Sequence, residues 1–138
     1  MCSYFKEVPK EELDKIHVLV VDDNKINQMI TKKTLSKMGI TAHAVDNGTL
    51  GVEEAKTNQY NMVLMDIHMP GISGHEATAQ IRSFDKEIII IALTAVTIND
   101  KKDEFENSGF NNIIPKPFKQ ELFEEILHTE LLKAKVIC

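Results

Sequence analysis

The segment Ile88–Leu93, with the sequence IIIIAL, is the most apolar run in the chain. Six consecutive apolar residues without polar alternation are typical of a strand that is covered on both faces, as strands in parallel sheets are. Parallel strands need a crossover connection between them, which is usually a helix. This run therefore predicts an α/β fold, in which the rest of the chain supplies alternating strands and helices.

The remaining sequence alternates in this way. Short runs rich in β-branched residues are separated by segments with apolar residues at helical spacing. The expected strands are Ile16–Val21, Thr41–Val45, Asn61–Met65, Ile88–Leu93 and Asn112–Pro115, and the expected helices are Lys25–Met38, Thr49–Lys56, His75–Phe84, Ile98–Asn107 and Lys119–Leu132. With right-handed crossovers, this pattern predicts a three-layer sandwich around a parallel sheet in the flavodoxin-like order 2-1-3-4-5.

The first expected helix carries clear signals at both ends. Asn24 is a good N-cap residue before it, and Gly39 follows it. The apolar residues within it form a loose stripe of Ile26, Met29, Ile30, Leu35 and Met38.

Polar residues after four of the five expected strands are candidates for a site. Asp22 and Asp23 follow the first strand, Asp66 the third, Thr94 the fourth and Lys116 the fifth. In open α/β sheets, ligands bind outside the carboxyl ends of the strands, where the strand order reverses. We therefore expect the three aspartates to meet between the first and third strands.

Three carboxylates in one crevice repel one another, by about 3 kcal/mol for a pair ~5 Å apart at an effective dielectric of ~20. Mg²⁺ resolves this repulsion, because it prefers oxygen ligands and often also binds phosphate oxygens. A lysine ammonium binds phosphate as a point charge, and a hydroxyl can donate to a phosphoryl oxygen. Together these groups predict phosphoryl transfer onto an aspartate.

Four segments carry a resemblance to a known family. They are VLVVDDNKIN (18–27), VLMDIHMPGISGHEAT (63–78), IIALTA (90–95) and PKPF (115–118). These motifs resemble those of the receiver domain of two-component response regulators, and most of all those of the receivers of hybrid histidine kinases. The resemblance covers residues 16–132, which leaves residues 1–15 as an N-terminal extension and residues 133–138 as a C-terminal tail.

The resemblance implies a role for each residue at the strand ends. Asp66 would accept the phosphoryl group. Asp23 and Asp66 would bind Mg²⁺ directly together with the backbone carbonyl of His68, and Asp22 would bind it through water. The residues implied to hold the phosphoryl group are Thr94 and Lys116.

The resemblance also implies a partner. The phosphoryl donor would be a histidine-containing phosphotransfer protein or a histidine kinase, and the domain would be a stand-alone regulator or part of a hybrid kinase. We expect docking around the first helix, on the face of Lys25, Gln28, Met29 and Lys32. Such a domain catalyses only its own phosphorylation and dephosphorylation. We therefore expect that this chain is not an enzyme that acts on a separate substrate.

Two alternatives stay open at this point. Ile113 stands where the family usually has Tyr, Phe or His, three residues before the lysine, and this leaves room for a phosphorylation-inactive interaction module. A haloacid-dehalogenase-type phosphatase also uses a strand-end Asp with Mg²⁺, Thr and Lys. Those enzymes need a second Asp two residues after the nucleophile, and His68 stands there instead.

Composition indicates the cellular compartment of the domain and the partners that it does not bind. A net charge of −5 argues against binding nucleic acid through bulk charge. No apolar run approaches the ~20 residues that span a bilayer, and the charged N-terminal residues do not fit a signal peptide. Cys2 and Cys138 are expected to be free thiols in a reducing compartment. We therefore expect a cytoplasmic domain without nucleic acid or membrane contact.

Overall fold

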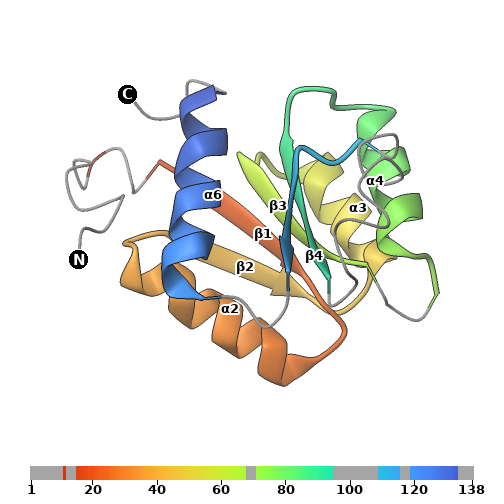
Figure 1. Ribbon diagram of the computed structural model, residues 1–138. Helices are drawn as coiled ribbons and strands as arrows, with labels where there is room; N and C mark the ends of the chain where they lie inside the picture. The colour runs from red at the N-terminus through yellow and green to blue at the C-terminus, as the bar shows by residue number, and fades with distance from the viewer. Residues whose placement is uncertain (1–10, 12–14, 68–70, 95–108, 116–118, 134–138) are drawn as a thin grey trace.

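The computed structural model describes residues 11, 15–67, 71–94, 109–115 and 119–133 (Figure 1). Their central element is a five-stranded parallel sheet in the order β2-β1-β3-β4-β5. The strands are β1 His17–Val21, β2 Thr41–Val45, β3 Met62–Asp66, β4 Ile89–Thr94 and β5 Asn112–Pro115. The predicted strand order is confirmed, and each predicted strand agrees with the observed one within one residue at either end.

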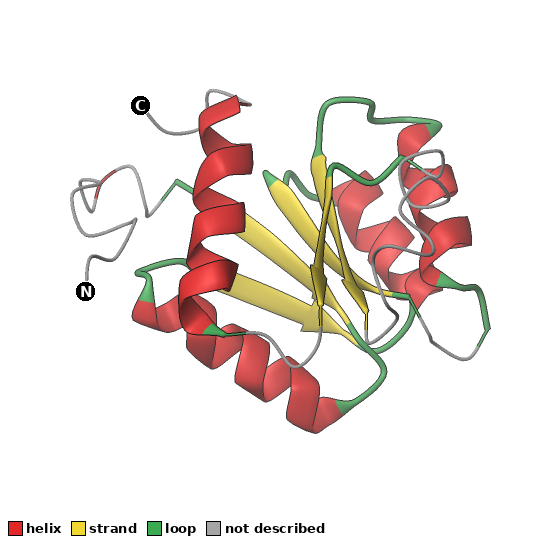
Figure 2. Ribbon diagram, in the orientation of Figure 1, coloured by secondary structure: helices red, strands yellow, loops and turns green. Residues whose placement is uncertain are grey.

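Helices cover both faces of the sheet (Figure 2). They are α2 Lys25–Lys37, α3 Gly48–Thr57, α4 Gly74–Arg82 and α6 Gln120–Lys133. Helices α2 and α6 pack on one face, and α3 and α4 pack on the other. The predicted helix Ile98–Asn107 lies outside the described residues. Among those residues, no helix has both the length and the apolar character that crossing a bilayer requires.

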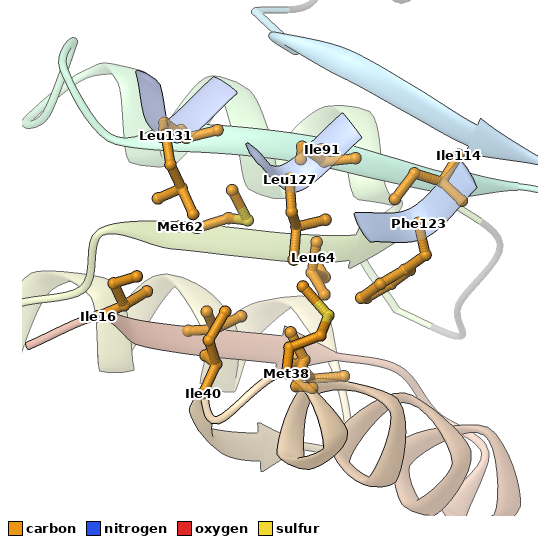
Figure 3. Packing of buried hydrophobic residues seen from close by; sticks show 14 of the residues in the cluster. Ile16, Met38, Ile40, Met62, Leu64, Ile91, Ile114, Phe123, Leu127 and Leu131 are labelled. Carbon is orange, nitrogen blue, oxygen red and sulfur yellow. The ribbon is translucent and has the colours of Figure 1, made fainter. Parts of the chain in front are cut away.

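Two hydrophobic clusters hold these layers together, one on each face of the sheet. The first lies under α2 and α6, where Phe123, Leu127 and Leu131 pack on the strands (Figure 3). The side chains of β4 alternate between the clusters: Ile89, Ile91 and Leu93 belong to the first, and Ile90 and Ala92 to the second. This two-sided burial is the reason that the strand is apolar throughout.

The ends of α2 are as the sequence predicts. The side chain of Asn24 accepts hydrogen bonds from the backbone N–H groups of Ile26 and Asn27 at 2.8 and 3.1 Å. Beyond the helix, Gly39 has a φ of 81°, a left-handed conformation that glycine adopts without steric cost. The cap and the glycine therefore define where this helix begins and ends.

The apolar stripe of α2 does not mark its buried face. Leu35 and Met38 are buried, but Ile26, Met29 and Ile30 are 67%, 68% and 51% exposed. The buried positions in the helix instead include three polar residues, Gln28, Thr31 and Thr34. The first two turns of α2 therefore present apolar side chains to solvent and polar side chains to the sheet.

Candidate functional site

The sheet brings the ends of β1 and β3 together. The two strands are parallel neighbours, and Val21 pairs with Met65, so the next residues, Asp22 after β1 and Asp66 at the end of β3, lie side by side. Asp23 follows in the loop before α2. The strand order thus places these three residues at one edge because β1 and β3 lie at the point where the order reverses.

The carboxylates of Asp22, Asp23 and Asp66 converge. One carboxylate oxygen from each lies within 4.8 Å of the others. Asp22 and Asp66 are buried, and Asp23 is exposed. Burial strengthens the repulsion between like charges, whereas a hard divalent cation satisfies several carboxylate oxygens at once. The donor set, all oxygen and open to solvent at Asp23, fits Mg²⁺.

The loop that carries Asp22 and Asp23 is tied down at several points. The backbone N–H of Asp22 donates to the carbonyl oxygen of Val45 at 3.2 Å, and the backbone N–H of Asn24 donates to the Asp22 carboxylate at 2.9 Å. The first bond joins the loop to the end of β2, and the second turns the chain toward α2. The acidic loop is therefore held by β2 on one side and by the helix cap on the other.

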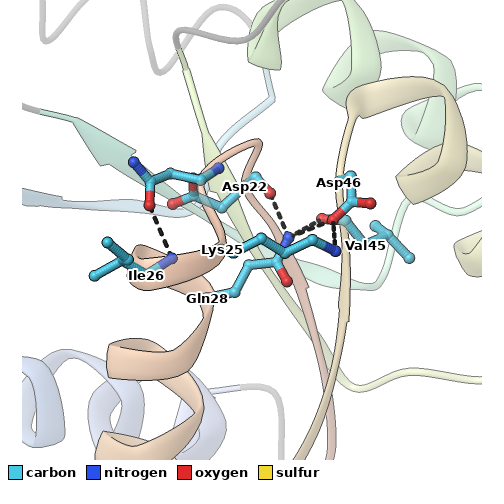
Figure 4. Close-up of polar contacts among 7 residues, drawn as sticks. Asp22, Lys25, Ile26, Gln28, Val45 and Asp46 are labelled. Atoms are coloured by element: carbon cyan, nitrogen blue, oxygen red, sulfur yellow. Dashed lines mark hydrogen bonds and ion pairs between the residues drawn. The ribbon is translucent and has the colours of Figure 1, made fainter.

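A fourth carboxylate, Asp46, lies beside this loop, and it was not among the residues predicted for the site. The Asp46 carboxylate accepts hydrogen bonds from the Lys25 ammonium and the Gln28 side-chain amide, each at 2.8 Å (Figure 4). These bonds, first the one from Lys25 and then the one from Gln28, lower the pKa of the Asp46 carboxyl below its usual value. Asp46 follows β2 directly, and its place after a strand was the signal that could have revealed it.

The chain after Asp66 is held by backbone contacts. The N–H of Ile67 donates to the carbonyl oxygen of Leu93 at 3.3 Å, and the N–H of Gly74 donates to the carbonyl oxygen of Ile67 at 3.1 Å. Ser73 caps α4 by accepting a hydrogen bond from the N–H of Glu76 at 3.2 Å. The start of α4 is therefore fastened directly behind Asp66.

The other predicted site residues are placed only in part. Thr94 ends β4, and its backbone pairs with Pro115 at the end of β5, at the same edge of the sheet as Asp66. The side chain of Thr94 and all of His68 and Lys116 lie outside the described residues. The roles of all the predicted site residues, the three aspartates included, stay predictions.

Ile113, which replaces the usual aromatic residue, is buried in the second hydrophobic cluster. It lies in β5 beside Ala92 of β4. Its aliphatic side chain is thus part of the core that α3 and α4 cover.

Comparison with known proteins agrees with this fold. Residues 18–128 match the family model of the response regulator receiver domain. The chain is 37% identical over 111 residues to transcription factor SKN7 of Saccharomyces cerevisiae, which covers 80% of the chain but only 18% of SKN7. Since the chain spans so little of this relative, the likeness concerns one domain and not the whole transcription factor.

Two solved receiver domains have nearly the same fold. The receiver domain of the sensor histidine kinase PA1611 from Pseudomonas aeruginosa, solved with a magnesium ion in its active-site cleft, has a TM-score of 0.78 and 30% identity. This match covers 84% of the chain and 97% of that domain. The receiver domain of Saccharomyces cerevisiae Ssk1, solved with the histidine phosphotransfer protein Ypd1, has a TM-score of 0.75 and 33% identity over 83% of the chain and 87% of that domain.

The family that four short segments indicated is therefore confirmed over most of the chain. The sheet order, the acidic edge and the family match agree. This chain belongs to the response regulator receiver domain family of two-component systems.

Proposed function

We propose that residues 16–132 accept a phosphoryl group on Asp66 from a phosphohistidine donor in a two-component phosphorelay. The observation that carries this proposal is the convergence of three carboxylates within 4.8 Å at the edge of the sheet. Asp22, Asp23 and Asp66, together with the backbone carbonyl of His68, would hold Mg²⁺. When bound, Mg²⁺ neutralises charge that develops on the phosphoryl oxygens.

The proposed reaction is a displacement at phosphorus. A carboxylate oxygen of Asp66 attacks the phosphorus atom, the phosphorus–nitrogen bond to the donor imidazole breaks, and its electron pair leaves with the imidazole. The product is an acyl phosphate on Asp66. Asp66 suits this step because the backbone of the next residue, Ile67, is hydrogen-bonded to Leu93 of β4 and to Gly74 of α4, so that the position of Asp66 is set before the donor arrives. Thr94 and Lys116 would bind the phosphoryl oxygens.

A test of the site needs only a small donor. We expect the protein incubated with Mg²⁺ and acetyl phosphate to gain one phosphoryl group by intact mass, and peptide mapping to locate it on Asp66. Asp66→Asn and EDTA should each abolish the gain. Asp85→Asn, at the opposite edge of the sheet, is the matched control and should be labelled like the natural chain.

The outcomes separate the candidate functions. Label that persists in Asp66→Asn would contradict the assignment of the phosphoacceptor. A natural chain that takes no label would favour the phosphorylation-inactive interaction module, and catalytic turnover of phosphate monoesters would favour the phosphatase.

We also propose that the donor docks on the outer face of α2. The predicted face included Gln28, which is wrong, because Gln28 is buried against the sheet. The exposed side chains of Ile26, Met29 and Ile30 recur at helical spacing and form an apolar strip next to the acidic loop. A strip of this kind suits a helix of a partner. The class of partner that we propose is a histidine phosphotransfer protein, and the Ssk1 receiver was solved with a protein of that class.

A further inference from the structure

We propose that Gln28 is a positioning residue for the acidic cluster. Its side-chain amide joins the loop after β1 to the end of β2, and so holds Asp22 and Asp23 at the spacing that a divalent cation requires. This inference rests on the proposed function, since it concerns the same site. Helix α2 would then have two roles: its inner face positions the acidic cluster, and its outer face is the proposed docking surface.

The amide of Gln28 makes three short contacts. Its Nε2 atom donates to the carbonyl oxygen of Asp22 at 2.7 Å, to the carbonyl oxygen of Val45 at 3.2 Å and to the Asp46 carboxylate at 2.8 Å (Figure 4). Gln28 is only 7% exposed, so water does not readily replace these bonds. An amide nitrogen has two hydrogens, and three acceptors therefore share them.

These acceptors come from different parts of the chain. Asp22 follows β1, and Val45 ends β2, so that one amide bridges the ends of neighbouring strands. Asp22 also donates its own N–H to Val45, and its carboxylate accepts from Asn24. The peptide groups on both sides of Asp22 are thus held, and the bond from Asn24 also restrains its carboxylate.

Asp46 closes the arrangement on the outer side. It accepts from Gln28 and from Lys25, and both donors belong to the first two turns of α2. The start of the helix is therefore attached to the end of β2 through two side chains and to the acidic loop through Gln28. A leucine at position 28 would leave two buried carbonyl oxygens without this donor, and the loop would move to find other partners.

The consequence concerns metal affinity. Partners in the shell behind a metal site orient the ligands, and their removal typically lowers metal affinity 10- to 100-fold. We expect Gln28→Leu to weaken Mn²⁺ binding, with Mn²⁺ as a spectroscopic substitute for Mg²⁺, by about tenfold in a titration followed by electron paramagnetic resonance. When Mg²⁺ is added to compete with Mn²⁺, the Mg²⁺ affinities of the natural chain and of Gln28→Leu should differ by the same factor.

A control separates positioning from general destabilisation. Met38→Ala removes buried side-chain atoms at the far end of α2, and thermal unfolding shows whether its loss of stability matches that of Gln28→Leu. We expect Met38→Ala to bind Mn²⁺ as the natural chain does. Equal weakening in both variants, or unchanged affinity in Gln28→Leu, would overturn the proposed role of Gln28.

A second pair of variants serves if Gln28→Leu does not fold. Asp46→Asn and Asp46→Ala both remove the negative charge, but only Asn keeps an oxygen that can accept from Gln28. We expect Asp46→Ala to bind Mn²⁺ more weakly than Asp46→Asn, and equal affinities would contradict the inference. A natural chain that binds no Mn²⁺ would instead reject the proposed metal site itself, and the inference with it.

Discussion

A Cβ atom at Gly74 would lie 2.5 Å from the carbonyl oxygen of Asp66. The same atom would lie 2.9 Å from the Cα atom of Ile67. Both neighbours are backbone atoms at the buried end of β3, so they cannot turn away as a side chain could. Glycine is required here for space, and its small size lets α4 begin directly against the residue that we propose as the phosphoacceptor.

We therefore expect Gly74→Ala to lower the free energy of unfolding by about 1–3 kcal/mol, as overpacking of a tight site does. Urea unfolding measures this loss. Gln80→Ala, on the exposed side of the same helix, should change it by about 0.5 kcal/mol at most. If Gly74→Ala has the same free energy of unfolding as the natural chain, the backbone after Asp66 can shift to make room for the added methyl group.

The apolar strip on α2 predicts a selective defect. Met29→Glu places a charge in the centre of the strip and should slow phosphoryl transfer from a phosphorylated histidine phosphotransfer protein about tenfold, as loss of a central interface side chain does. The rate with acetyl phosphate should not change, because this donor needs no docking surface. Ser36→Glu adds the same charge at the other end of the helix and is the control. If both donors slow equally, the strip is not the docking site.

The first cluster predicts a large difference between two adjacent residues of α6. Phe123 is fully buried, whereas Leu122 is 36% exposed. Phe123→Ala should lower the free energy of unfolding by about 3–5 kcal/mol, because the cavity would not collapse fully. Leu122→Ala should cost about 1 kcal/mol. Chemical denaturation of both variants tests this, and similar losses would contradict the assigned helix orientation.

Tyr60 predicts a loss of stability in alkali. Burial, and then the hydrogen bond that its hydroxyl donates to Glu54 at 2.8 Å, raise the pKa of Tyr60 to about 12. Since the folded state favours the neutral phenol, its contribution to stability is fully present below about pH 10 and is lost as the pH rises through about 12. The difference in unfolding free energy between the natural chain and Tyr60→Phe should therefore shrink over that range. A constant difference would contradict the raised pKa.

Much of the fold could be predicted because its signals are local. Apolar runs give the strands, and residues such as Asn24 and Gly39 mark helix ends through their own side-chain or backbone chemistry. The meeting of Asp22 with Asp66 could also be predicted, because it depends only on strand order. These features follow from rules that need no knowledge of side-chain packing.

The orientation of α2 could not be predicted in this way. Periodicity places apolar residues inside, but the space inside the first two turns is lined by carbonyl oxygens at the ends of β1 and β2, which need a donor such as Gln28. Those acceptors come from residues 6 and 17 positions away in the sequence. A pattern read along one helix does not contain them.

Helix α2 is only 13 residues long, and its first two turns face the strand ends on one side and solvent on the other. Gln28 points inward to the strand ends, while Met29, the next residue, points to solvent. Anyone who retargets such a domain by transplanting residues 26–30 as a block would exchange the inner anchor together with the outer contacts. Redesign of recognition here has to proceed one residue at a time and leave position 28 untouched.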